Sequence, residues 1–394
     1  MKRVSMETRK EVIKRQKKVY EKAGKKEKGR ILDGICDATG LSRDRVGRVL
    51  RAKESVERKG ERRRGRKARY SEPAVIRLLE KLWVQMDCVC GKRLCAGLGR
   101  MVEALRRYGE LDAPEWAVEK VLELSPATAD RLLRKARQAT ELCGRSSTKP
   151  GSLRKKDIPI RLGGEWEEEK PGYMEMDLVA HCGETTAGDY VNTLDMTDIY
   201  SGWTETEAVV NKAQKHVFTA IKAIRARLPF MLLGVDSDNG SEFINEQLYR
   251  YCKEEKLVFT RSRPNRKNDN CHVEQKNYSV VRKQVGYGRY EGEQAVKVLN
   301  EYYGLLRLYG NYFLPSMKLI GKERRGARVV KRYETPVTPY ERLLSSPDIS
   351  QEGKAALRAQ CIQLNPAALK RDMAILQERI QMLALPHARP AARP

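Results

Sequence analysis

Short apolar runs alternate with amphipathic stretches between residues 171 and 285, and this order restricts the fold more than any other feature of the chain. Three strand-like runs come first, and two helix–strand pairs follow. The short apolar run MLLGVD (231–236) is typical of a buried central strand. The order predicts an α/β domain with a mixed five-stranded sheet, with strands at 173–179, 190–196, 203–210, 231–236 and 257–262 and helices at 214–228 and 242–255.

Three acidic residues occupy distinctive places on this framework. Asp177 lies in the middle of the first strand, Asp238 follows the apolar run, and Glu274 lies near the start of the helix after the last strand. Mg²⁺ prefers oxygen ligands and is held by a few carboxylates that converge from separate elements. Two such ions about 4 Å apart can activate an attacking oxygen and stabilise a leaving oxygen at a phosphodiester. The three residues are the predicted catalytic and metal-binding site, with Mg²⁺ or Mn²⁺ as the ion.

Several charged residues lie close to these three acids in the sequence. Asp236 is the competing ligand, because it lies two residues before Asp238 and residues two apart on a strand share a face. Lys276 and Lys283 share a face of the Glu274 helix and are predicted to hold phosphate, with a solvated helix face as the alternative. The other acids are expected at the surface or in turns: Glu175, Asp195, Asp198 and Asp269.

Two motifs carry a family resemblance that covers about residues 170–285. The segments DNGSEF and HVEQKN resemble the second-aspartate and glutamate motifs of D,D(35)E insertion-sequence transposases and of retroviral integrase cores. The resemblance implies a ribonuclease-H-like fold, the triad named above, strand cleavage, transfer of a 3′-hydroxyl into target DNA, and at least a dimer on DNA. Retroviral integrases also have an N-terminal His/Cys zinc domain. No His precedes residue 181 here, so no zinc is expected.

The N-terminal region is strongly basic. Residues 1–70 contain 26 Lys and Arg against 10 Asp and Glu, so +16 of the net charge of +26 lies there. Such a surplus is costly in self-repulsion unless a polyanion is the partner, which favours double-stranded DNA. The tract 57–70 is predicted to be a linker that contacts phosphates, or a solvated tether; its candidate DNA-binding residues are Arg62, Arg63, Arg64 and Arg66.

Residues 1–56 are predicted to form a helix-turn-helix domain. Gly40 provides the turn, and the following helix has Val46, Val49 and Leu50 facing inward. That helix is predicted to enter the major groove, although a plain helical hairpin fits the same apolar positions. Its outward basic residues are Arg43, Arg45, Arg48 and Arg51.

The remaining segments differ in composition. A second helical, helix-turn-helix-like domain is predicted at 71–142, a linker at 143–170, the catalytic core at 171–310, a basic region at 311–345 and a helical tail at 346–394. The basic run from 322 to 332 is predicted to be a hairpin or an arm against DNA. No stretch has the apolar length of a membrane span or a signal peptide, so no membrane partner and a bacterial cytoplasmic location are expected.

Together these features predict a DNA transposase that binds the terminal repeats of a mobile element and joins them to target DNA. Two alternatives are a catalytically inactive DNA-binding regulator that retains the core, and a ribonuclease-H-like nuclease that cuts without joining. All three carboxylates are retained, which argues against the first alternative. The helix-turn-helix region argues against the second.

Overall fold

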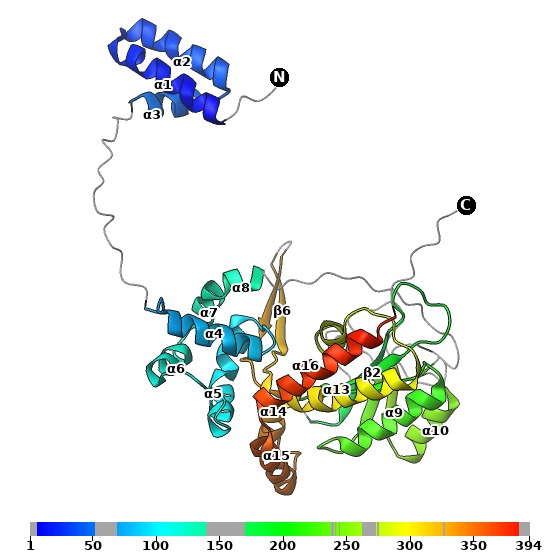
Figure 1. The fold of residues 1–394 in the computed structure, drawn as a ribbon. Helices are drawn as coiled ribbons and strands as arrows, with labels where there is room; N and C mark the ends of the chain where they lie inside the picture. Colours follow the sequence, from blue (N-terminus) through cyan, green and yellow to red (C-terminus); the bar gives the residue numbers. More distant parts are fainter. Residues whose placement is uncertain are drawn as a thin grey trace. The chain divides into compact units, whose positions relative to one another are not determined.

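The computed structural model describes residues 6–51, 69–138, 170–237, 245–261, 276–325 and 328–385, together with Gly240, Glu242, Phe243 and Val273. The chain divides into two compact units, Met1–Arg69 and Tyr70–Pro394, which are drawn in Figure 1. Among the residues described, no helix combines the length and the hydropathy that a membrane crossing requires.

The first unit contains three helices, α1 (Met6–Lys22), α2 (Lys25–Thr39) and α3 (Arg43–Arg51). Its core is small and consists of Ile13, Tyr20, Ile35, Val46 and Leu50. Gly40 ends α2 with a φ of 65°, and its N–H donates to the carbonyl of Cys36, as the predicted turn requires.

One predicted core position of α3 is wrong. Val49 is 45% exposed, whereas Val46, Gly47 and Leu50 form the buried stripe. At 100° per residue, Val49 lies beyond the edge of the stripe that these three residues define.

Five strands of the second unit form one mixed sheet with the order β3-β2-β1-β4-β5. The strands are β1 (Tyr173–Ala180), β2 (Asn192–Asp198), β3 (Thr204–Val209), β4 (Gly234–Ser237) and β5 (Val258–Arg261). The central strand β1 is antiparallel to β2 and parallel to β4. The predicted α/β, ribonuclease-H-like fold class is confirmed, with strand bounds that differ from the predicted ones by three residues or fewer.

The two faces of this sheet have opposite character, because side chains alternate along each strand. One face is apolar: Met174 and Met176 of β1 pack with Leu194 and Met196 of β2 under α9 (Gln214–Arg227) and α10 (Glu246–Glu254). The other face is polar and carries acidic and hydroxyl side chains on β1, β2 and β4. The polar residues there include Glu175, Asp177, Thr193, Asp195 and Asp236.

The prediction that Glu175, Asp195 and Asp198 lie at the surface or in turns is wrong, because all three are fully buried. A buried carboxylate requires hydrogen bonds to offset the loss of water. Asp198 ends β2 and accepts from the backbone N–H groups of Gly172 at 2.8 Å and Ser201 at 2.7 Å. These bonds fix the turn between β2 and β3. Asp269 lies outside the described residues.

The buried Asp198 carboxyl predicts a dependence of stability on pH. Burial raises its pKa to about 6, and hydrogen bonds from Ser201 and Gly172 oppose this rise. An unfolded aspartate titrates near about pH 3.9. Between the two values the folded state holds a proton that the unfolded state has lost, so stability falls as the pH rises through 6.

The free energy of unfolding should therefore fall by about 3 kcal/mol between about pH 4 and about pH 7, relative to an Asp198→Asn variant. Urea denaturation of both proteins over this range measures the difference. The same dependence of the unfolding free energy on pH in the two proteins would contradict the raised pKa of Asp198.

The helices that precede the five sheet strands in the sequence and the helices that follow them share one hydrophobic core. The N-terminal set is α4 (Pro73–Gln85), α5 (Gly91–Arg107), α6 (Glu115–Leu122), α7 (Pro126–Leu132) and α8 (Arg134–Gln138). The C-terminal set is α13 (Gly292–Phe313), α14 (Pro339–Ser345), α15 (Gln351–Gln363) and α16 (Pro366–Leu383). Helix α16 lies along α13 and begins at Pro366.

Candidate functional site

Asp177 lies on the polar face of the central strand β1, and its side chain is half-buried. Its Oδ1 accepts a hydrogen bond from the N–H of Leu178 at 2.8 Å. Its Oδ2 accepts one from the Nδ2 of Asn277 at 2.6 Å. The predicted position of Asp177 in the middle of a central strand is therefore confirmed, and Asn277 is a contact that the sequence analysis did not assign.

Asn277 begins a π-helical stretch, Asn277–Arg282, that continues into α12 (Lys283–Val285). Such stretches are rare and often occur at functional sites. Asn277 lies three residues after Glu274, and residues three apart lie on the same side of a helix. This spacing is the sequence signal that could have identified Asn277.

Removing the Asn277 amide is expected to lower activity that depends on Asp177 by about 10-fold to 100-fold, as is typical of groups that orient a metal-binding side chain. The reason is that Asn277→Ala leaves the Asp177 carboxylate without the donor to its Oδ2. Rates of DNA strand transfer measure the effect. Tyr278→Phe is the matched control, because Tyr278 is the next residue and is 54% exposed; equal rates for the two variants would refute this role.

Val273, which precedes Glu274 in the sequence, is hydrogen-bonded to strand β1. The buried Glu175 carboxylate accepts a hydrogen bond from the N–H of Val273 at 3.1 Å. Glu175 thus positions the residue that directly precedes Glu274. Glu274 itself lies outside the described residues.

Asp195 of β2 is the register partner of Asp177 and is fully buried. Among the described residues, its Oδ2 has no hydrogen-bond partner. Burial raises the pKa of Asp195 well above its ordinary value, the Lys276 ammonium opposes the rise, and the Asp177 charge adds to it. Burial also lowers the pKa of Lys276 to about 8, although Asp195 opposes this change. The described part of the site thus places two acidic side chains, Asp177 and Asp195, near the Lys276 ammonium.

The second predicted aspartate follows β4 directly. Ser237, the last residue of β4, is the register partner of Met176, which precedes Asp177 on β1. Asp238 lies outside the described residues. Its competitor Asp236 is fully buried, and its Oδ1 accepts a hydrogen bond from the Thr260 hydroxyl.

The predicted DNA-binding residues fall into three groups. The arginines of α3 are all exposed: Arg43, Arg45, Arg48 and Arg51. Those of the basic tract lie outside the described residues: Arg62, Arg63, Arg64 and Arg66. The two lysines near Glu274 are each hydrogen-bonded to a backbone carbonyl, and their predicted phosphate contacts remain a prediction. Lys276 donates to the carbonyl of Gly202 at 3.2 Å, and Lys283 donates to the carbonyl of Asp87 at 2.5 Å.

Asp87 also connects the N-terminal helices to the helix that follows Glu274. Its carboxylate accepts from Gln284 Nε2 at 3.2 Å and is paired with Lys370 of α16. A cavity of about 80 Å³ lies beside this contact and is lined by Arg93, Lys276 and Arg307, among others. This volume matches two or three water molecules, since one water occupies about 30 Å³ in the liquid.

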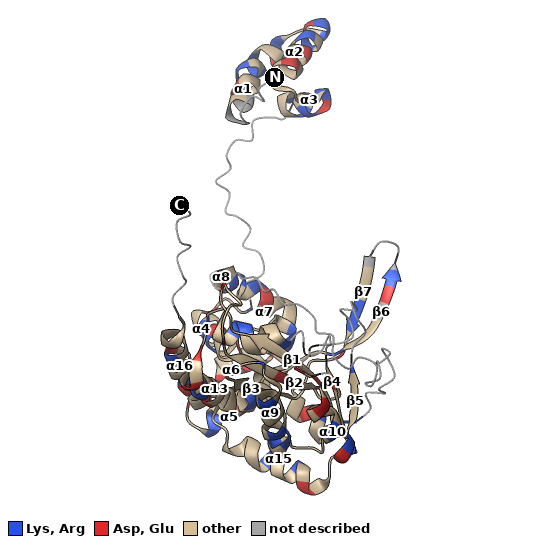
Figure 2. Ribbon diagram, turned by 90° about the vertical axis from the view of Figure 1, so that its right-hand side faces the viewer, with Lys and Arg blue, Asp and Glu red and all other residues tan. Residues whose placement is uncertain are grey.

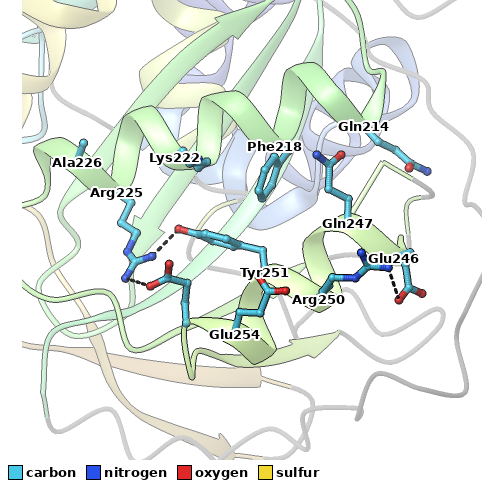
Figure 3. Close-up of a pocket in the computed structure, with 11 residues that line it drawn as sticks. Gln214, Phe218, Lys222, Arg225, Ala226, Glu246, Gln247, Arg250, Tyr251 and Glu254 are labelled. Atoms are coloured by element: carbon cyan, nitrogen blue, oxygen red, sulfur yellow. Dashed lines mark hydrogen bonds and ion pairs between the residues drawn. The ribbon is translucent and has the colours of Figure 1, made fainter.

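A larger groove of about 940 Å³ lies elsewhere, between α9 and α10 on the apolar-face side of the sheet (Figure 3). Its charges are balanced and partly paired with one another. Arg225 contacts Tyr251 and Glu255, at 2.5 Å and 3.0 Å. The groove is on the opposite side of the sheet from Asp177, so it is not part of the candidate site.

Comparisons with known proteins identify similarities in the same part of the chain. A family model described as "Integrase core domain" matches residues 167–267. The "Uncharacterized protein y4rM" of Sinorhizobium fredii is 42% identical over 340 residues, which is 86% of this chain and 96% of that protein.

Two solved structures are also similar to part of the chain. The catalytic core domain of BIV integrase is 16% identical, covers 43% of this chain and 91% of its own, and gives a TM-score of 0.27. The catalytic core domain of HTLV-2 integrase, described as dimeric and in complex with magnesium, is 12% identical, covers 37% and 90%, and gives a TM-score of 0.29.

Proposed function

Since the chain belongs to the same family as the Sinorhizobium fredii protein and carries an integrase core domain, we propose that it is a DNA transposase. In this proposal it binds the ends of a mobile element, cleaves a DNA strand at each end and transfers the freed 3′-hydroxyl into target DNA. The observation that carries the proposal is that Val273 and Asn277, which lie on either side of Glu274 in the sequence, are hydrogen-bonded to Glu175 and Asp177 of the same strand.

The proposed catalytic and metal-binding residues are Asp177, Asp238 and Glu274. Asp177, the proposed ligand that the structure describes, offers carboxylate oxygens, which Mg²⁺ prefers. The Oδ2 atom of the buried Asp195, the register partner of Asp177, has no hydrogen-bond partner among the described residues and is a further oxygen of this kind. The described residues contain no cluster of three or more possible metal ligands, since Asp238 and Glu274 lie outside them. When bound, Mg²⁺ or Mn²⁺ would supply Lewis-acid stabilisation at the phosphate.

This chain's own residues have separate tasks in the proposal. Asn277 holds the Asp177 carboxylate through its Oδ2, and Glu175 holds the backbone N–H of Val273. Lys276 is fixed to the Gly202 carbonyl, so its ammonium remains beside Asp195 rather than in solvent. The exposed arginines of α3 would contact element-end DNA, and two ends held together require at least a dimer.

A strand-transfer assay tests the proposed function. The substrate is a duplex with the terminal sequence that flanks the gene, and the products are analysed with Mg²⁺, with Mn²⁺ and with a chelator. Joined products that depend on the added ion are expected. Cleavage without joining would replace the proposal with a nuclease, and binding without cleavage would replace it with a DNA-binding regulator.

A further inference from the structure

Two strands after α13 form a hairpin that is separate from the main sheet. They are β6 (Leu319–Arg325) and β7 (Arg328–Tyr333), and among the described strands they pair with each other alone. Figures 1 and 2 both show the hairpin projecting from the body of the second unit. An isolated two-stranded hairpin is marginally stable in water, so a projecting one is expected to have a partner.

Apolar side chains of the hairpin are exposed rather than packed in a core. Ile320 is 67% exposed, Val329 is 47% exposed and Val330 is 36% exposed. Val329 and Val330 are consecutive on β7, so they lie on opposite faces of the ribbon. Both faces therefore offer contact area, as expected of an element that inserts between two walls rather than one that lies flat on a surface.

The charge of the hairpin identifies the class of partner. Between residues 319 and 333 there are six Lys and Arg and one acidic residue, Glu323. Arg324, Lys331 and Arg332 are all exposed. A basic ribbon disfavours pairing with a strand of another protein, because Lys and other charges on edge strands block such contacts. A polyanion complements this charge.

The base of the hairpin is held firmly, close to the candidate site. Glu334, the residue after β7, accepts from the N–H of Lys318 at 3.0 Å and from Arg342 Nε at 3.1 Å. Arg342 is 8% exposed and donates to the Ser201 carbonyl at 2.9 Å. The adjacent Gly202 carbonyl accepts from Lys276. One short series of contacts thus joins the hairpin base to the helix that follows Glu274.

We propose that the β6–β7 hairpin inserts into a groove of duplex DNA and holds that duplex beside the catalytic site. The major groove is about 12 Å wide and admits a two-stranded β-ribbon. The fixed base would set the distance between the groove and Asp177. This inference rests on the proposed function, because it assigns the surface that holds DNA for the reaction. The duplex is either the element end or the target, since both offer the same phosphates.

A triple variant of the full chain, Arg324→Gln, Lys331→Gln and Arg332→Gln, tests the proposal. The matched control replaces three basic residues on α15 and α16, Lys354→Gln, Arg358→Gln and Arg379→Gln. Binding is measured over a salt series by fluorescence anisotropy, with one labelled duplex of the flanking terminal sequence and one of unrelated sequence. Each lost phosphate contact reduces the slope of log affinity against log salt by about 0.9.

The hairpin variant is expected to lose about 2 to 3 units of this slope, and the control variant none. A reduced slope with the terminal duplex assigns the hairpin to the element end. A reduced slope with both duplexes extends this assignment to target DNA. A photo-crosslinking residue at Ile320 should also form adducts with the affected duplex. The hairpin assignment alone would be overturned if the hairpin variant keeps the wild-type slope and Ile320 forms no adduct, while the wild-type protein performs strand transfer. Failure of the wild-type protein to bind either duplex would overturn the proposed function.

Discussion

The Asp177→Asn variant is expected to lose strand cleavage and strand transfer by at least about 10³-fold, while its affinity for end DNA stays within about twofold of wild type. The reason is that a metal ion contributes several kcal/mol of transition-state stabilisation, and each 1.36 kcal/mol is about a tenfold change in rate. Asparagine keeps the size of the side chain and its acceptor oxygen, but removes the charge. Gel assays of cleavage and joining, and anisotropy for binding, measure the two properties separately.

Asp189→Asn is the matched control for this variant. Asp189 lies between β1 and β2 and is exposed, so the same chemical change there should leave both activities unaltered. Full cleavage by Asp177→Asn would remove Asp177 from the proposed site. Weak activity of Asp189→Asn would show instead that general charge loss, and not the central carboxylate, explains the effect.

The Glu205→Ala variant is expected to lower the free energy of unfolding of the second unit by about 3–5 kcal/mol, because it removes the carboxylate that pairs with the partly buried Arg307 and accepts from the Trp203 indole, while Arg227 keeps Glu207. The Glu205 carboxylate is fully buried on β3 and pairs with Arg227 at 2.7 Å and Arg307 at 3.1 Å. It also accepts a hydrogen bond from the indole of Trp203 at 2.8 Å. Urea denaturation followed by circular dichroism measures the loss.

Glu207→Ala provides the comparison. Glu207 lies two residues along the same strand and also pairs with Arg227, at 2.5 Å, but its side chain is 20% exposed. Arg227 keeps Glu205 as a partner in this variant, so the cost should be about 1 kcal/mol, typical of a more exposed ion pair. Similar losses in the two variants would mean that burial of Glu205 does not determine its contribution.

The order of strands and helices along the chain and the place of Asp177 could be predicted because they depend on local patterns. Alternating apolar and polar residues define β1, and a short apolar run precedes Asp238. The burial of Glu175 and Asp195 could not be predicted in the same way. Their burial depends on partners far along the chain, Val273 for one and Lys276 for the other. Single-sequence patterns do not report such contacts.

The roles of Lys276 and Lys283 show the same limit. Their spacing of seven residues places them on one helical face, and the sequence analysis interpreted that face as a phosphate contact. In the structure their ammonium groups donate to backbone carbonyls of Gly202 and Asp87, which come from two other segments. A helical face can be predicted from spacing, whereas the element that covers it depends on the tertiary fold.

The core shared by the helices before and after the sheet has a consequence for how such a gene can change. Arg100 of α5 pairs with Glu341 of α14 at 2.6 Å, and Gln85 of α4 donates to the Pro366 carbonyl at 2.7 Å. A genetic crossover between α8 and β1 would separate all of these partners at once. One placed before Tyr70, at the boundary between the two units, would break none of them. We therefore expect the first unit to be exchanged between related genes more readily than any part of the second unit, which would be transmitted as a single block.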